Sequence, residues 1–180
     1  MKNWTFALAL GAAVCVGSVA YAGDQMTPLA EAGDWVAIAH SDSVTDPPDV
    51  CLASSLTMPM LALRADDQGN LDVRLVNNSW SLPADVTGNI EINVNNHKYT
   101  YAIVSNTSSD VDASITQDQL TALVGDMETA SSMQIKAGSG APTTTSLDGS
   151  KTVLTAFMTC AGIDNPSQNT GGSNPFSSSN

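Results

Sequence analysis

Apolar and polar residues alternate along two short stretches of the chain, 71–76 and 89–94. Successive side chains of a strand point to opposite faces, so this period of two predicts strands with one buried face. The residues predicted to be buried are Leu71, Val73, Leu75, Ile90, Ile92 and Val94. Each stretch has a second extended run beside it in the sequence: 60–64 comes before 71–76, and 98–104 comes after 89–94. The turns between the runs contain Asn, Asp or Gly. The pattern therefore predicts two antiparallel hairpins.

Further strands are predicted on both sides of these hairpins. They cover 34–40, 51–57, 131–137 and 143–147. Residues 41–50 contain three aspartates and Pro47-Pro48, which is typical of a loop because proline cannot donate a hydrogen bond to a strand ladder. The segment 23–33 has no strong period, and we predict no strand or helix there.

Two short helices are predicted in the last third of the chain. Thr116 and Gln119 have the spacing of a capping box, in which each side chain binds the backbone N–H of the other residue. Apolar residues then recur at helical spacing, at Leu120, Leu123, Val124 and Met127. A second helix is predicted over 150–160. Its apolar stripe consists of Val153, Leu154 and Phe157.

Together these elements predict a mainly β fold, an antiparallel β-sandwich or barrel-like domain with two short helices. We expect a single β-rich domain over 23–163. The tail 164–180 is rich in Ser, Asn and Gly and has too few apolar residues to bury, so it is predicted to be disordered.

The first residues, 1–22, are predicted to be a signal peptide. Lys2 supplies a positive start, residues 4–19 form an uncharged and largely apolar run, and Ala20-Tyr21-Ala22 has the small-x-small pattern of a cleavage site. The alternative is a retained membrane anchor, which the polar residues after Ala22 disfavour. We expect an exported chain that is not stably inserted in the membrane after cleavage.

The cysteines fit export. Of the three, Cys15 lies in the predicted signal peptide, which leaves Cys51 and Cys160 in the mature chain. Two cysteines in an exported protein most simply form a disulfide, and two buried free thiols are the alternative.

The charge balance excludes two classes of partner. Lys and Arg number 6 against 18 Asp and Glu, a formal net charge of −12. Nucleic acids and anionic lipid surfaces are bound through clustered cations, which this chain lacks. We therefore expect neither partner, and the negative charge favours basic partners or cations.

Candidate catalytic residues are few. His40 is followed by Ser41, Asp42 and Ser43, so base, nucleophile and acid types are close in sequence, but catalysis needs a spatial geometry that sequence neighbours do not guarantee. His97 lies in a predicted turn, where a surface role is the simpler interpretation. No cofactor motif is present, so we expect no cofactor and no catalytic residues. A small hydrolase using His40 is the alternative.

One stretch has the oxygen ligands of a calcium site. Asp66, Gln68, Asn70 and Asp72 alternate as in a calcium-binding loop, with Asp66, Asn70 and Asp72 as the candidate ligands. A hairpin turn explains the same residues and is the interpretation we favour. The aspartates of the loop 41–50 are likewise interpreted as solvated, so no metal site is expected.

Two short motifs resemble the bacterial invasion-associated locus B family. Gly33-Asp34-Trp35 opens the domain, and Ser146-Leu147-Asp148-Gly149-Ser150 leads from a strand to a helix that ends near Cys160. In that family such motifs bracket an exported β-rich domain. The resemblance implies a periplasmic or surface-associated, non-enzymatic protein linked to host or envelope interactions, and it transfers no catalytic residue.

These observations lead to one expected function and two alternatives. We expect a non-catalytic binding or accessory protein in the periplasm or at the cell surface of a Gram-negative bacterium, with another protein as its partner. One alternative is an inhibitor of an exported enzyme that uses the loop 41–50. The other is the hydrolase around His40.

Overall fold

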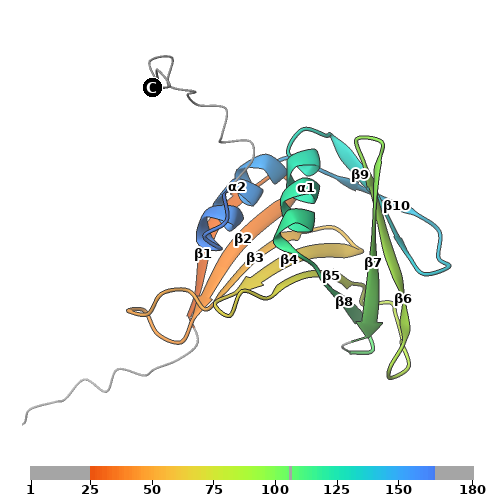
Figure 1. Ribbon diagram of the computed structural model, residues 1–180, viewed down its shortest axis with the longest axis horizontal. Helices are drawn as coiled ribbons and strands as arrows, with labels where there is room; N and C mark the ends of the chain where they lie inside the picture. The colour runs from red at the N-terminus through yellow and green to blue at the C-terminus, as the bar shows by residue number, and fades with distance from the viewer. Residues whose placement is uncertain (1–24, 106, 165–180) are drawn as a thin grey trace, which may run out of the picture.

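The computed structural model describes residues 25–105 and 107–164 (Figure 1). The expected signal peptide 1–22 lies outside the described residues, and so does the expected tail 164–180 apart from Asp164. The described chain forms one antiparallel sheet of ten strands with two helices, which confirms the predicted mainly β fold. The sheet is strongly curved and is not closed (Figure 1).

The strands pair in the order β1-β2-β3-β4-β5-β8-β7-β6-β9-β10. Their bounds are β1 Gln25–Ala32, β2 Trp35–Ser41, β3 Val50–Ser55, β4 Met60–Asp66, β5 Leu71–Val76, β6 Thr87–Val94, β7 His97–Ser105, β8 Asp110–Ser114, β9 Ser132–Ala137 and β10 Thr143–Ser146. Both predicted hairpins are present, as β4–β5 and β6–β7. The six alternating apolar residues predicted to be buried all lie in the core.

The prediction of no regular element over 23–33 is wrong, because this segment contains strand β1. Its hydrophobic period is hidden for three reasons. Pro28 interrupts the pattern, and the register with β2 shifts between Pro28 and Ala30, which is a β-bulge. β1 is also an edge strand, so most of its side chains are exposed and carry little periodic signal.

The two helices lie on the inner, concave face of the sheet (Figure 1). Helix α1, Gln117–Met127, begins at the predicted capping box. The Gln119 backbone N–H donates to Thr116 Oγ1, and the Thr116 backbone N–H donates to Gln119 Oε1. Helix α2, Ser150–Cys160, packs against β1, β2 and β3. Within the described residues, neither helix is long and apolar enough to span a membrane.

A disulfide joins Cys51 in β3 to Cys160 at the end of α2, with the two Cα atoms 6.0 Å apart. The predicted pairing is confirmed. The bridge holds the C-terminal end of α2 against the sheet, beside a core that contains the fully buried Trp35 and Phe157.

The two motifs that carry the family resemblance contact each other. The Asp34 backbone N–H donates to Asp148 O at 3.2 Å, and Trp35 Nε1 donates to Ser146 O at 3.0 Å. Gly149 has a φ of +80°, and a Cβ atom there would lie 2.0 Å from Ala32 O. The motifs therefore form one joint that connects the β1–β2 end of the curved sheet to the β10–α2 junction.

Candidate functional site

The outward-facing side chains of neighbouring strands form rows across the convex face of the sheet. In an antiparallel pair, residues directly opposite each other point to the same face. One row consists of Pro28, Ile38, Leu52, Arg64, Asp72 and Ser114. The next consists of Val36, Ser54, Ala62, Arg74 and Asp112, of which the small Ser54 and Ala62 are buried. We call the outer surface of β2, β3, β4, β5 and β8, with the loop 42–49 and the turn 67–70, the outer face.

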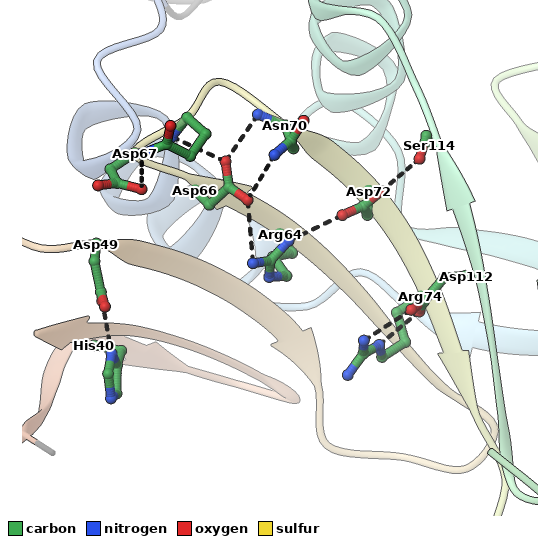
Figure 2. A network of polar contacts seen from close by, with 11 residues as sticks. His40, Asp49, Arg64, Asp66, Asp67, Asn70, Asp72, Arg74, Asp112 and Ser114 are labelled. Atoms are coloured by element: carbon green, nitrogen blue, oxygen red, sulfur yellow. Dashed lines mark hydrogen bonds and ion pairs between the residues drawn. The ribbon is translucent and has the colours of Figure 1, made fainter. Parts of the chain in front are cut away.

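Arg64 lies between two carboxylates of the outer face (Figure 2). Its Nη1 donates to Asp72 Oδ2 at 3.1 Å and its Nη2 donates to Asp66 Oδ2 at 3.2 Å. Asp66 also accepts the backbone N–H groups of Gln68 and Asn70 and the side-chain amide of Asn70. The hydrogen bond from the Asn70 side chain is the main cause that lowers the pKa of Asp66 below its ordinary value. Asp66 is therefore held as a carboxylate.

Arg74 forms the second charged pair of the outer face. Its Nε and Nη2 donate to the two carboxylate oxygens of Asp112 at 2.6 and 2.8 Å, and this bidentate pair links β5 to β8. The same hydrogen bonding is the main cause that raises the pKa of Arg74. Both arginines of the face are thus paired with carboxylates. Further aspartates of these strands and their loops leave the face net negative: Asp42, Asp46, Asp49, Asp67 and Asp110.

Aliphatic side chains adjoin this charged area. On β2 and β3 the half-buried, outward-facing residues are Val36, Ile38, Val50 and Leu52. Leu52 is directly opposite Arg64 in the β3–β4 pair, so the boundary between aliphatic and charged surface runs between these two strands. The outer face therefore combines an aliphatic half with an acidic half.

The lysines of the sheet lie elsewhere. Lys98 on β7 and Lys136 on β9 both lie near Glu91 on β6. The distance to Glu91 Oε2 is 3.1 Å from Lys98 Nζ and 3.9 Å from Lys136 Nζ. Both lysines therefore lie beside a glutamate, away from the acidic area of β4, β5 and β8.

The predicted calcium ligands lie in and beside the β4–β5 turn. Asp66 and Asn70 contact each other, and Arg64 occupies the position between Asp66 and Asp72. Asp72 Oδ1 accepts a hydrogen bond from Ser114 Oγ at 2.9 Å. The carboxylate oxygens of Asp66 and Asp72 thus bind donors of the protein itself, and a calcium site stays the alternative to the favoured hairpin turn.

His40 is the last outward-facing residue of β2 and contacts Asp49 at the far end of the loop that follows (Figure 2). Its Nδ1 lies 2.6 Å from Asp49 Oδ1, and the hydrogen bond from His40 is the largest cause that lowers the pKa of Asp49. The loop also brings Asp42 close, so that one ligand atom from each of the three residues lies within 4.8 Å of the other two. The neighbouring Ser41 is buried and alternates to the inner face, and Ser43 Oγ donates to Asp46 Oδ2 at 2.8 Å. The structure thus brings His40 together with carboxylates and places Ser41 on the opposite face.

A second polar site, not predicted from the sequence, lies between β7 and α1. His97 Nδ1 is 2.6 Å from Asp126 Oδ2, and Tyr99 donates to the same oxygen. Burial would raise the pKa of Asp126, but hydrogen bonds from Tyr99 and His97 outweigh burial and lower it. These residues line a groove of about 450 Å³ together with Asp118 and Thr121. The turn at 95–96 and the helical spacing were visible in the sequence, but no sequence signal pairs β7 with α1.

The two tyrosines of β7 are expected to resist ionisation. Burial, together with the Asp126 carboxylate, raises the pKa of Tyr99, and burial raises the pKa of Tyr101 to about 12. A free tyrosine ionises at about pH 10. Because the folded state favours the neutral hydroxyls, their contribution to stability is complete below about pH 10 and is lost as the pH rises towards 12 and beyond.

The measurement is a titration of tyrosinate absorbance in a Tyr21→Phe background, where Tyr99 and Tyr101 are the remaining tyrosines. We expect almost no tyrosinate at the pH where the urea-unfolded chain is half ionised. Replacing Tyr101 by phenylalanine assigns the steps. Native and unfolded curves that coincide would contradict the buried positions of these hydroxyls.

The chain was also compared with known proteins. No family model, no curated protein and no solved structure gives a significant match to it.

Proposed function

We propose that this protein is a non-catalytic binding or accessory protein that is exported to the periplasm or cell surface of a Gram-negative bacterium and recognises a basic protein through its outer face. The observation that carries this proposal is the composition of that face. Half-exposed aliphatic side chains of β2 and β3 adjoin an ordered acidic area on β4, β5 and β8. The resemblance to the invasion-associated locus B family agrees with such a role.

The physical argument starts from how interfaces are composed. Their centres are apolar and their rims are polar, and charge complementarity selects the partner and speeds association. Here both described helices lie on the concave side, so no described helix covers the outer face (Figure 1). Ile38 and Leu52 supply apolar contact area, and the neighbouring aspartates attract Lys and Arg.

The scaffold is suited to this use because it is cross-linked. The disulfide joins β3 to α2, and the charge pairs join β4 to β5 and β5 to β8, so these elements are tied together before binding. A preformed surface loses less conformational entropy on association.

The test is a comparison of two lysine variants in capture from an envelope fraction at low salt. Ile38→Lys puts a positive charge at the centre of the aliphatic half, and we expect it to weaken partner retention about tenfold or more. Thr100→Lys is the control for adding a lysine elsewhere on the sheet, since Thr100 is an exposed strand residue directly opposite Glu91 in the β6–β7 pair. It should leave retention unchanged.

Salt provides the second criterion. A partner held by the acidic half should be released as the ionic strength rises, because screening weakens interactions between exposed charges. The proposal fails if nothing is retained, if both variants lose the partner equally, or if the retained protein is acidic.

A further inference from the structure

At the two ends of the loop between β2 and β3, three side chains of types that can bind a metal ion lie close together. His40 is the penultimate residue of β2, Asp49 is directly before β3, and the Asp49 backbone N–H donates to His40 O at 3.0 Å. Asp42 lies at the start of the loop and is exposed. Ligand atoms of the three residues all lie within 4.8 Å of one another. No other group of three histidine, cysteine or carboxylate ligands converges in this way within residues 25–105 and 107–164.

The three ligand atoms lie no more than 4.8 Å apart, so small side-chain movements bring them to the spacing of ligands around a single metal ion. Zinc binds imidazole nitrogen at about 2.0–2.1 Å and carboxylate oxygen at about 2.0–2.2 Å, so two ligands of one tetrahedral ion lie roughly 3.4 Å apart. His40 Nδ1 and Asp49 Oδ1 are 2.6 Å apart and are joined by a hydrogen bond through one proton. A metal ion that replaces this proton needs a widening of less than about 1 Å.

The donor types select the class of ion. An imidazole nitrogen is a borderline donor that suits zinc and its neighbours, whereas calcium and magnesium prefer oxygen ligands throughout. Two carboxylates and one neutral imidazole balance a divalent charge. The side chains of His40 and Asp49 are 25% and 33% exposed and Asp42 is exposed, so an ion can enter directly from solvent.

We propose that His40, Asp42 and Asp49 form a binding site for a divalent transition-metal ion of the zinc class, with water completing the coordination. The site is distinct from the predicted calcium ligands on β4 and β5, and it does not depend on the protein-binding role of the outer face. A bound ion joins the two ends of the loop 42–49 through its coordination bonds.

The molecule contains a matched control for this proposal. His97 and Asp126 make the same contact, with Nδ1 and Oδ2 2.6 Å apart, but they belong to no convergent group of three ligands in the described chain. If an exposed histidine–aspartate pair were sufficient to hold the ion, both sites would bind it. If the third ligand is required, only the site at His40 will bind the ion.

The experiment is a zinc competition titration of the untagged full-length chain against a chromophoric chelator, with calcium in a parallel titration. We expect one zinc ion per chain. His40→Gln should weaken its affinity about a hundredfold and Asp42→Asn about tenfold. His97→Gln should leave the affinity unchanged, and excess calcium should not displace the zinc.

Four results would overturn the proposal: no zinc bound by the wild type, zinc retained at full affinity by His40→Gln, equal losses in His40→Gln and His97→Gln, or displacement by calcium. Circular dichroism of each metal-free variant checks the fold. Should His40→Gln fail to fold, Asp42→Asn decides the question, because Asp42 is exposed in the loop and its amide is isosteric.

Discussion

Replacing Gly149 by alanine is expected to lower the free energy of unfolding by about 3–5 kcal/mol. Gly149 has a φ of +80°, where an L-residue is strained, and its added Cβ would lie 2.0 Å from Ala32 O. That atom belongs to the backbone of β1 and cannot rotate away. Relief of the contact requires β1 and the start of α2 to move apart, which opens the joint between the two sequence motifs.

Gly69→Ala separates the cost of the backbone conformation from the cost of the close contact with Ala32. Gly69 has a φ of +81°, nearly identical to that of Gly149, but a Cβ there would meet no atom within 4 Å. We expect this variant to cost only about 1–2 kcal/mol, the cost of the backbone conformation alone. Urea unfolding of both variants measures the difference. Equal losses at the two positions would show that the close approach to Ala32 is unimportant.

Removal of the disulfide is expected to have an effect of similar size. Cys51 and Cys160 are separated by 109 residues, and in the chain-entropy description a loop of this length contributes about 4–5 kcal/mol by restricting the unfolded chain. The Cys51→Ala/Cys160→Ala double variant should therefore unfold at a much lower urea concentration than the wild type, with the free end of α2 losing its attachment to β3.

The wild type in reductant is the control for this variant. It retains both sulfur atoms and loses only the bond, so its unfolding midpoint should approach that of the double variant. A reduced protein as stable as the oxidised one would contradict a stabilising role for the bridge.

The individual elements could largely be predicted from local patterns. The alternation in 71–76 and 89–94 identifies β5 and β6 because each buries one face, and Thr116 with Gln119 marks the start of α1 because capping is a local interaction. β1 could not be found this way, because a bulge and an exposed edge remove the period. β8, Asp110–Ser114, was also not predicted, since Val111 and Ala113 are its only buried residues.

The order of the strands lies beyond any local pattern. β8 pairs with β5, and β6 pairs with β9, through contacts between distant segments. The same limit applies to the candidate sites. The sequence placed His40 beside Asp42 and singled out Asp49 only as a loop acid, because the convergence of all three depends on how the loop 42–49 returns to β3. It also gave no sign that Arg64 stands between Asp66 and Asp72.

The joint between the motifs has a consequence for how the molecule is assembled. Trp35 and Ser146, which are 111 positions apart, bond only when nearly all of the domain has been made. Folds rich in such distant contacts form slowly, because chain entropy is lost before the contacts are gained. The N-terminal strands therefore have no completed partner surface until α2 arrives, and a nascent chain stopped before Gly149 should remain unfolded and accessible to protease.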